Sequence, residues 1–365
     1  MSEFILILLW IGLCAFFARQ LKVTKTELVC GVEEERYYWF FAFIVFLPII
    51  IMAGLRGDFA DTFGYRISFN DLPSDFSEFG RYLETVKKDK GFSILAFIIK
   101  SVVGNNAVFY FFIIAFIQGL ILLSVYRKYS TDYILSVFLF IVSTDYVAWM
   151  FNGIRQFVAV TIVFAAIKLM LSKKYIPLLI IILFASTMHQ SALLMIPIVI
   201  IVQGKAWNKK TLIFIFIVLL SILFLDLFTN ILDDTLQNTQ YVNVVRDYKS
   251  WKDDGTNPLR VLLYSIPTII AFFGRKKIAE SDSKLINLCV NMSIVSTGLY
   301  VISIFTSGIF IGRLPIYASL FNYILLPWEI KHIVHKKYQV LFSLLLIIVY
   351  LVFYYYQMHL KWALF

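Results

Sequence analysis

The chain has 365 residues, of which 60% are hydrophobic and 15% are charged, and its mean hydropathy is +0.81. Soluble globular domains carry about 25% charged residues, so this composition excludes a water-soluble globular protein. The net charge of +10 does not indicate nucleic-acid binding, because the basic residues form short clusters between apolar runs rather than one basic patch.

Apolar runs that approach the length of a membrane-crossing helix recur along the whole chain. About 20 apolar residues in a helix cross roughly 30 Å of hydrocarbon, so the sequence predicts an all-α polytopic membrane protein with about 11–12 membrane-crossing helices. We expect one integral membrane domain over residues 1–365. The apolar runs are 4–18, 37–55, 106–126, 133–150, 154–171, 175–187, 190–203, 211–229, 259–273, 285–305, 310–330 and 338–356.

The runs 175–187 and 190–203 fit either one long tilted helix or a hairpin of two short helices that turns at Thr187–Gln190. The positive-inside rule favours the hairpin, because it places most Lys and Arg residues in the loops on one side of the membrane. His189 is then expected at or near the outer leaflet. The N- and C-termini are also expected outside, and residues 4–18 are expected to form a retained first helix rather than a signal peptide.

The same topology places the two long connections, 56–91 and 230–258, on the outer side. Both are mixed in charge and rich in aromatic residues. Residues 92–103 are apolar but too short to span, so we expect them to lie on the outer face or to dip into it. The sequence therefore predicts that the functional side of the protein is the outside.

Four groups of polar residues are expected to meet on this side. Asn152 is expected to cap a helix that carries Arg155 in its first turn, near the positive end of the helix dipole. The other candidates are Arg56, Asp58, Asp61 and Tyr65 in the first group, Gln156 beside Arg155 in the second, His189 with Gln190 and Ser191 in the third, and Arg313 with Tyr317 in the fourth.

Three of the four groups also have a structural interpretation, whereas Arg155, which begins a long apolar helix beside polar Asn152 and Gln156, is harder to explain in this way. Arg56 and Arg313 fit arginines that snorkel from a helix end to lipid headgroups. Asp58 and Asp61 fit structural ion-pair partners of Arg56. His189 fits a hydrogen-bonded packing residue. Four further aromatic residues are expected in the interfacial belt, namely Tyr146, Trp149, Tyr241 and Trp251.

Three arginines on one membrane face suggest an anionic substrate, because guanidinium groups bind phosphate through two hydrogen bonds and stay charged in a low-dielectric site. A phosphorylated lipid headgroup is the natural candidate, and the aromatic and carboxylate residues of the outer connections suit an attached glycan. The sequence contains no Walker loop, HExxH motif or nucleophile elbow. No metal and no cofactor are expected, and the three cysteines are too far apart in sequence to suggest a disulfide framework.

At these positions the sequence resembles the EpsG-type, Wzy-like polysaccharide polymerases. GLRGDFADTFGY is similar to the family's arginine–aspartate–threonine–tyrosine signature after the second helix, and FNGIRQFVAVTIVFAA is similar to its asparagine–arginine–glutamine helix. ASTMHQSALLMIPI resembles the histidine–serine–alanine–leucine hairpin, and IGRLPIYASLF the late arginine–tyrosine segment. The four motifs occur in the family's order across about residues 50–330.

The resemblance implies a metal-independent glycosyltransferase of the bacterial cytoplasmic membrane, with an architecture like that of GT-C glycosyltransferases. Its donor and acceptor would be undecaprenyl-pyrophosphate-linked oligosaccharides, joined on the outer face into O-antigen, capsule or exopolysaccharide. Membrane lipids and a chain-length regulator protein are further implied partners. Arg155 and Arg313 would clamp the donor pyrophosphate with help from Arg56. Either His189 or Asp61 would act as the base, and the pKa of His favours His189.

Two other classes remain open at this point. One is a transporter of a lipid-linked or anionic solute, although the sequence shows no convincing internal repeat and its notable charges lie at the outer interface. The other is a glycan ligase or acyltransferase, which also works on the outer face.

Overall fold

The computed structural model describes residues 3–58, 61–236 and 255–364. The described part is helical except for one two-stranded hairpin, and it divides into two compact units. The first unit comprises Met1–Leu193 and Leu344–Phe365, and the second unit comprises Leu194–Ser343. The predicted all-α polytopic class is confirmed.

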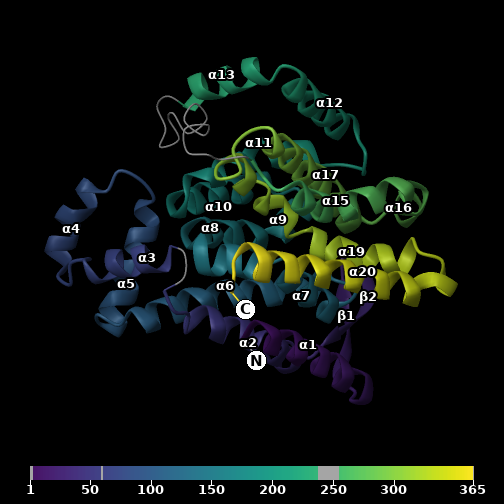
Figure 1. Cartoon of the computed structure of the whole chain (residues 1–365), viewed down its shortest axis with the longest axis horizontal. Coiled ribbons are helices and arrows are strands. Elements are labelled where there is room, and N and C mark those ends of the chain that lie inside the picture. The colour runs from purple at the N-terminus through teal and green to yellow at the C-terminus, as the bar shows by residue number, and fades with distance from the viewer. Residues whose placement is uncertain (1–2, 59–60, 237–254, 365) are drawn as a thin grey trace. The chain divides into compact units, whose positions relative to one another are not determined.

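The first unit contains most of the elements that carry the first three predicted groups (Figure 1). Its elements are α1 (Glu3–Gln20), β1 (Thr24–Val29), β2 (Val32–Tyr37), α2 (Trp39–Gly54), α3 (Thr62–Asn70), α4 (Phe76–Thr85), α5 (Lys90–Val103), α6 (Ala107–Tyr129), α7 (Tyr133–Val142), a π-helix (Tyr146–Asn152), α8 (Ile154–Ala165), α9 (Ile167–Leu171), α10 (Tyr175–Met188) and most of α20 (Gln339–Tyr355), which continues into a second π-helix (Tyr356–Lys361).

The core of the first unit forms around α6, which packs against α2 and α8. A row of stacked phenylalanine rings joins the neighbouring helices: Phe46 of α2 lies 6.3 Å from Phe140 of α7, and Phe140 lies 6.2 Å from Phe157 of α8, between ring centroids. All three rings are fully buried. This row of rings connects α2, α7 and α8, and each of these helices also contacts α6.

The apolar runs do not predict the hairpin of β1 and β2, because it lies in the charged stretch between the runs 4–18 and 37–55. Its alternating TKTELV and VEEERY stretches pair in antiparallel register around a turn at Cys30 and Gly31, which both have positive φ as hairpin turns require. Arg127, in the last turn of α6, pairs with Glu27 of β1 at 2.5 Å. The hydrogen bond from Arg127 lowers the pKa of Glu27 to about 2. The ion pair therefore fastens the hairpin to the end of α6.

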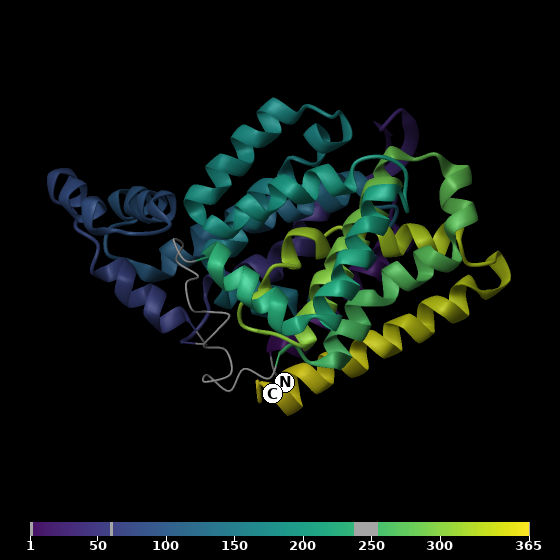
Figure 2. The ribbon, with the colours of Figure 1, turned by 90° about the horizontal axis from the view of Figure 1, so that it is seen from above.

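The connection 56–91 also contains regular structure. It includes α3 and α4, and Asp75 caps α4 by accepting from the backbone N–H groups of Ser77 and Glu78. Figure 2 shows α3, α4 and α5 (blue) as a group that projects from the rest of the first unit. Lys100 of α5 donates to the carbonyls of Asn70 and Leu72, at 2.7 and 2.6 Å, and so holds α5 against the end of α3.

The second unit forms around α17, which packs against α11, α12, α15 and α19. Asn287 and Asn291 of α17 accept from the backbone N–H groups of Ala206 and Trp207, at 2.8 and 3.2 Å, and so fix the loop before α12. The elements of this unit are α11 (Met195–Val202), α12 (Lys209–Leu223), α13 (Leu225–Leu236), α15 (Pro258–Phe273), α16 (Arg275–Ser281), α17 (Lys284–Ile304), α18 (Ile316–Ser319), α19 (Asn322–His332), and 3-10 helices at Ile311–Arg313 and Lys336–Tyr338.

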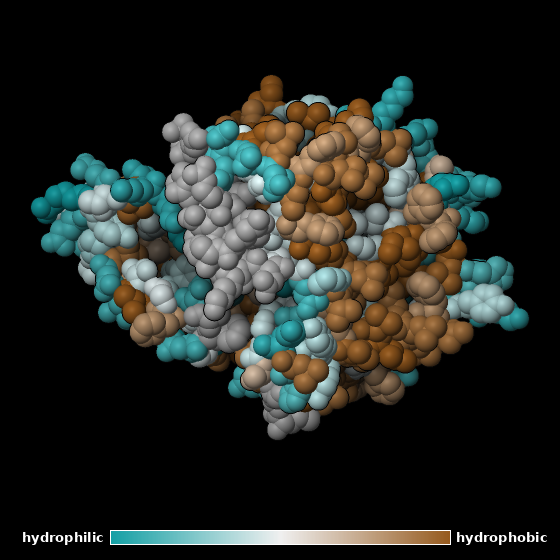
Figure 3. All heavy atoms as spheres, turned by 45° about the horizontal axis from the view of Figure 1, so that its top comes forward, coloured by the Kyte–Doolittle hydropathy of each residue, from teal (hydrophilic) through white to brown (hydrophobic). Residues whose placement is uncertain are grey.

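Within the described residues, four helices are long and apolar enough to cross a membrane: Glu3–Gln20, Ala107–Tyr129, Lys284–Ile304 and Lys336–Lys361. The number rises to six if each of two bent helix pairs is one span. Five further apolar helices are shorter, so the expected 11–12 crossings stay a prediction. Figure 3 shows apolar side chains gathered over broad areas of the surface, as expected for helices that face lipid.

Several predicted spans are interrupted. The run 133–150 bends by 72° between α7 and the π-helix, and the run 211–229 bends by 106° between α12 and α13. The run 310–330 is not one helix, because Pro315 lacks a backbone N–H, and a 3-10 turn, α18 and α19 follow one another instead. The break between 175–187 and 190–203 is confirmed: α10 ends at Met188 and His189 is extended, with φ −159°.

The interfacial position predicted for Tyr146 and Trp149 is wrong. Both side chains are buried in the first unit, because the π-helix turns them inward. The hydroxyl of Tyr146 hydrogen-bonds the hydroxyl of Tyr354 at 2.8 Å. Tyr241 and Trp251, and most of the connection 230–258, lie outside the described residues.

Candidate functional site

Arg56 follows α2 and is an internal anchor of the first unit. Its side chain is buried between the rings of Phe111 and Phe151, whose centroids lie 4.4 and 5.5 Å from the guanidinium carbon, and Nη1 donates to the carbonyl of Met150. Burial lowers the pKa of Arg56 to about 9, which leaves it charged at neutral pH. The interpretation that Arg56 snorkels to headgroups is therefore wrong, because only 7% of the residue's surface is exposed.

The predicted pairing of Arg56 with Asp58 is also wrong. Asp58 pairs with Arg66 of α3 at 3.0 Å, and both side chains are partly exposed. Asp61 is exposed at the N-cap position of α3, and it forms no ion pair with Arg56 within the described residues. Sequence spacing predicts both aspartates near Arg56, but the guanidinium of Arg56 instead contacts two phenylalanine rings and the carbonyl of Met150.

The π-helix Tyr146–Asn152 joins the first two predicted groups. The carbonyl of Met150 accepts from Arg56, and the carbonyl of Phe151 accepts from the hydroxyl of Thr62 at 3.3 Å. The side chain of Asn152 accepts from the backbone N–H of Asp61 at 3.3 Å. A π-helix shifts the hydrogen-bond ladder and is frequent at functional sites. Here its end fixes the start of α3.

The predicted capping role of Asn152 is therefore wrong. Gly153 occupies the N-cap position of α8 and no side chain caps this helix. Asn152 belongs to the preceding π-helix, which turns its side chain towards Asp61 instead. The predicted position of Arg155 in the first turn of α8 is confirmed. Gln156 is buried beside it.

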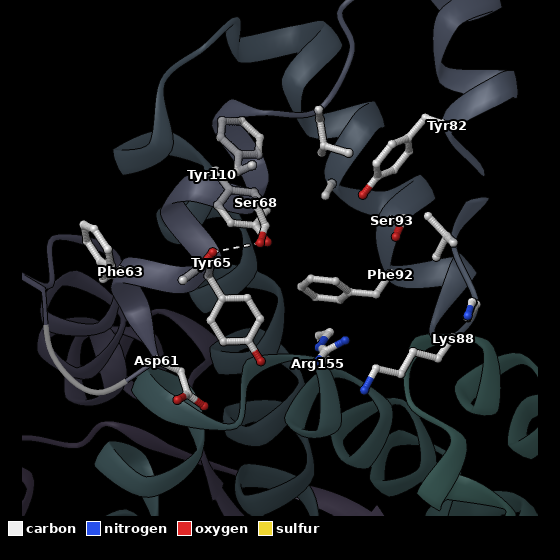
Figure 4. A pocket seen from close by; sticks show the side chains of 16 residues that line it. Asp61, Phe63, Tyr65, Ser68, Tyr82, Lys88, Phe92, Ser93, Tyr110 and Arg155 are labelled. Carbon is white, nitrogen blue, oxygen red and sulfur yellow. Dashed lines mark hydrogen bonds between the residues drawn. The ribbon is translucent and has the colours of Figure 1, made fainter. Parts of the chain in front are cut away.

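A pocket of about 740 Å³ opens between α3, α5 and the start of α8 (Figure 4). It contains three of the predicted site residues: Asp61, Tyr65 and Arg155. The rest of its lining is Phe63, Gly64, Ser68, Phe69, Leu72, Tyr82, Val86, Lys87, Lys88, Phe92, Ser93, Ala96 and Tyr110.

Aromatic rings form the walls of this pocket. The rings of Tyr65 and Phe92 lie edge to face with centroids 6.3 Å apart, and Figure 4 shows the hydroxyl of Tyr82 directed into the cavity. Aromatic faces with hydroxyl groups suit a sugar ring, which has apolar C–H faces and a polar rim. The pocket is therefore chemically suited to a glycan.

Charged side chains also line this pocket. Figure 4 shows the amino group of Lys88 directed to the same end of the pocket as the guanidinium of Arg155, and Asp61 lines the pocket from the start of α3. Arg155 lies with its guanidinium carbon 5.9 Å from the Tyr65 ring centroid. Three cations, Arg155, Lys87 and Lys88, and the carboxylate of Asp61 line the same cavity, and such a set can bind an anionic group next to a proton acceptor.

Arg155 is held from behind by Asp89. Its Nη1 donates to Oδ2 of Asp89 at 2.9 Å. Burial raises the pKa of the Asp89 carboxyl, and the charge of Arg155 opposes this rise. Asp89 was not predicted, because it lies within the charge run KKDKG, which reads as a solvated loop.

His189 does not line the pocket. It lies at the break after α10, half-buried, and its Nδ1 hydrogen-bonds the hydroxyl of Ser191 at 2.7 Å. The backbone N–H of the next residue, Gln190, donates to Oδ1 of Asp89 at 3.4 Å. The third predicted group is thus connected to Arg155 through Asp89.

Arg313 and Tyr317 belong to the second unit. Arg313 ends a 3-10 turn and is half-buried, and Tyr317 is buried in α18. The predicted meeting of this group with the other three stays a prediction.

Lys88, Tyr82 and Phe92 line the pocket but were not predicted as site residues. A signal for Lys88 existed in the sequence, since the basic run Lys87–Lys88 directly precedes an apolar helix on the expected functional side. Within residues 3–58, 61–236 and 255–364, no three His, Cys, Asp or Glu side chains come together as metal ligands.

Comparison with known proteins gives one family. The model described as the EpsG family matches residues 39–363. No match was found among the curated proteins or among the solved structures.

Proposed function

Because the chain belongs to the EpsG family, a family of Wzy-like polymerases, we propose that it joins undecaprenyl-pyrophosphate-linked oligosaccharide repeat units into a surface polysaccharide. The reaction takes place on the outer face of the bacterial cytoplasmic membrane. The donor is the growing glycan on its lipid carrier, and the acceptor is a new repeat unit on a second carrier. O-antigen, capsule and exopolysaccharide are all products of this reaction type.

The observation that carries the proposal is the pocket of the first unit, which combines aromatic walls with three cations and a carboxylate. In our proposal a sugar of the donor or acceptor lies against Tyr65, Phe92 and Tyr82. The pyrophosphate lies at the end of the pocket where Arg155 and Lys88 are found. Arginine and lysine neutralise the charge that develops on the departing pyrophosphate, as metal ions do in other phosphate sites.

The chemical step is a displacement at the anomeric carbon of the donor sugar. A hydroxyl oxygen of the acceptor forms the new bond to this carbon, and the bond from the carbon to the pyrophosphate oxygen breaks. Undecaprenyl pyrophosphate leaves with the electron pair, and the hydroxyl proton passes to a base of the protein. Arg155 stabilises the leaving group.

We assign the role of base to Asp61 rather than to His189. Asp61 lines the pocket, and its position at the start of α3 is fixed by Asn152. His189 does not line the pocket, and its Nδ1 is already bonded to Ser191. Arg56 contributes indirectly, since it holds the chain before α3 against the π-helix.

Reconstitution tests this proposal. The purified protein is incubated with undecaprenyl-pyrophosphate-linked repeat units from its own host, without nucleotide, and the products are separated by size. We expect a ladder spaced by one repeat unit, which Arg155→Ala abolishes while the variant stays folded in the membrane. An absence of any ladder with authentic substrate would favour transport or ligation to another acceptor.

A further inference from the structure

Asp89 lies directly behind the proposed pyrophosphate end of the pocket. Its side chain is 2% exposed, whereas that of Arg155 is 34% exposed. Asp89 does not line the pocket, but Arg155 does. Its carboxylate therefore contacts one nitrogen of the guanidinium, Nη1, from the protein side and leaves part of the group open to the cavity.

Asp89 also connects two further elements. It precedes α5, and its Oδ1 accepts from the backbone N–H of Gln190, just after the break at His189. Two residues along, Gly91 packs so closely on α10 that a Cβ there would lie 2.1 Å from the hydroxyl oxygen of Thr187. The start of α5, the first turn of α8 and the end of α10 therefore meet at this one carboxylate.

We propose that Asp89 is the positioning residue of the site: it orients Arg155 towards the substrate pyrophosphate and couples it to the segment that carries His189. This inference rests on the proposed function. Asp89 itself touches neither substrate nor reacting atoms. It acts through Arg155, whose Nη1 donates to Asp89 at 2.9 Å and whose Nε has no hydrogen-bond partner within the described residues. The side chain of Tyr65 also interacts with this guanidinium, from the pocket side.

The physical basis is that a charge-assisted hydrogen bond in a buried setting restricts a long side chain to one geometry. Arg loses rotamer freedom when it binds a ligand, and a restraint made in advance removes part of this cost. A misplacement of about 1 Å of a positioning group costs about 100-fold in rate. The loss of Asp89 is therefore expected to lower turnover even if the protein stays folded.

Two substitutions separate charge from shape. Asp89→Asn removes the charge but keeps the volume, and asparagine tolerates the left-handed backbone of this residue, with φ +55°. Asp89→Glu keeps the charge on a longer side chain. Glu280→Gln is the matched control, because it also removes one carboxylate charge from an ion pair, the exposed pair of Lys277 and Glu280.

The first readout is the rate of repeat-unit transfer. We expect Asp89→Asn to lower kcat/KM about 100-fold, mainly through kcat, with the melting temperature close to that of the wild type. The kcat/KM of Asp89→Glu is expected to be about tenfold higher than that of Asp89→Asn. Glu280→Gln is expected to have the kcat/KM of the wild type. In an Arg155→Lys background, Asp89→Asn should cause little further loss of kcat/KM, because both substitutions disrupt the same ion pair. Full activity of Asp89→Asn, or a full 100-fold further loss in that background, would overturn the inference.

The second readout does not need activity. Phenylglyoxal modification of Arg155 is measured by mass spectrometry relative to Arg66, whose side chain is similarly exposed, at 28%, and whose partner Asp58 is unchanged. We expect the ratio to rise about tenfold in Asp89→Asn, as one charge-assisted hydrogen bond is lost. An unchanged ratio would contradict the positioning role. If the wild type makes no polymer, the proposed function is wrong. The ratio of Arg155 to Arg66 modification still tests whether Asp89 positions Arg155.

Discussion

The carboxylate of Asp89 and the guanidinium of Arg155 form an ion pair of 2.9 Å between segments 66 residues apart. Asp89 is enclosed by protein, and Arg155 reaches into a pocket with aromatic walls. Because of this difference in exposure, we assign Asp89 to positioning and Arg155 to contact with the substrate.

Arg155→Lys keeps the positive charge but removes the planar fork that contacts Asp89 and that, in our proposal, also binds the substrate pyrophosphate. We expect kcat/KM for repeat-unit transfer to fall about 10–100-fold, because an ammonium group does not reproduce a bidentate contact. The matched control is Arg66→Lys, in the partly exposed pair with Asp58. Equal activity of the two variants would show that Arg155 acts only as a point charge.

Arg56→Ala is expected to act on stability rather than on catalysis. The change removes the stacking on Phe111 and Phe151 and leaves the carbonyl of Met150 without its donor. We expect a loss of about 2–4 kcal/mol and a lower melting temperature in detergent. A variant with wild-type stability and no polymer would instead assign Arg56 to substrate binding.

The choice of base is tested by Asp61→Asn and His189→Gln. If Asp61 accepts the hydroxyl proton, Asp61→Asn lowers kcat by about 10²–10⁴-fold with little change in KM. His189→Gln is expected to have the smaller effect, because this residue lies outside the pocket. The reverse order of the two effects would assign the proton transfer to His189.

The hairpin is expected to lose its attachment at low pH. The pKa of Glu27 is lowered from 4.5 to about 2 by the hydrogen bond from Arg127, so its stabilisation is present above pH 4.5 and is lost as the pH falls through about 2. At pH 7 we expect Glu27→Gln to destabilise the protein by about 1 kcal/mol, because the pair is partly exposed. The difference from wild type should shrink steadily between pH 4.5 and pH 2 in denaturation experiments. A difference that is independent of pH would rule out the ion pair as its source.

Much of the helical framework follows from apolar run lengths alone. Runs such as 106–126 and 285–305 correspond closely to α6 and α17 because nothing in them interrupts the helix. The position of Arg155 and the break at His189 were also predictable from local sequence. These features depend on neighbouring residues only.

The rest depends on tertiary contacts that local patterns do not contain. Asn152 has the sequence of a helix cap, but a π-helix runs through it and directs its side chain to the backbone of Asp61. Asp58 pairs with Arg66 of α3 rather than with the nearer Arg56, which is buried against Phe111 and Phe151. Asp89 pairs with Arg155 only after α5 packs on α10, and no sequence spacing predicts this.

The most direct test of the central claim blocks the pocket chemically. Cys30 is exposed and is replaced by serine, while Cys14 and Cys289 are buried. Ser93→Cys then places a thiol in the pocket wall on α5, and Ser101→Cys places one on the same helix outside the lining. After labelling with a bulky maleimide, repeat-unit ladders are compared for both variants. Our account predicts that the label at residue 93 abolishes the ladder, that undecaprenyl-pyrophosphate-linked repeat units protect this thiol from labelling, and that the label at residue 101 has no effect. A fully labelled Ser93→Cys protein that still makes wild-type ladders would contradict polymerisation in this pocket.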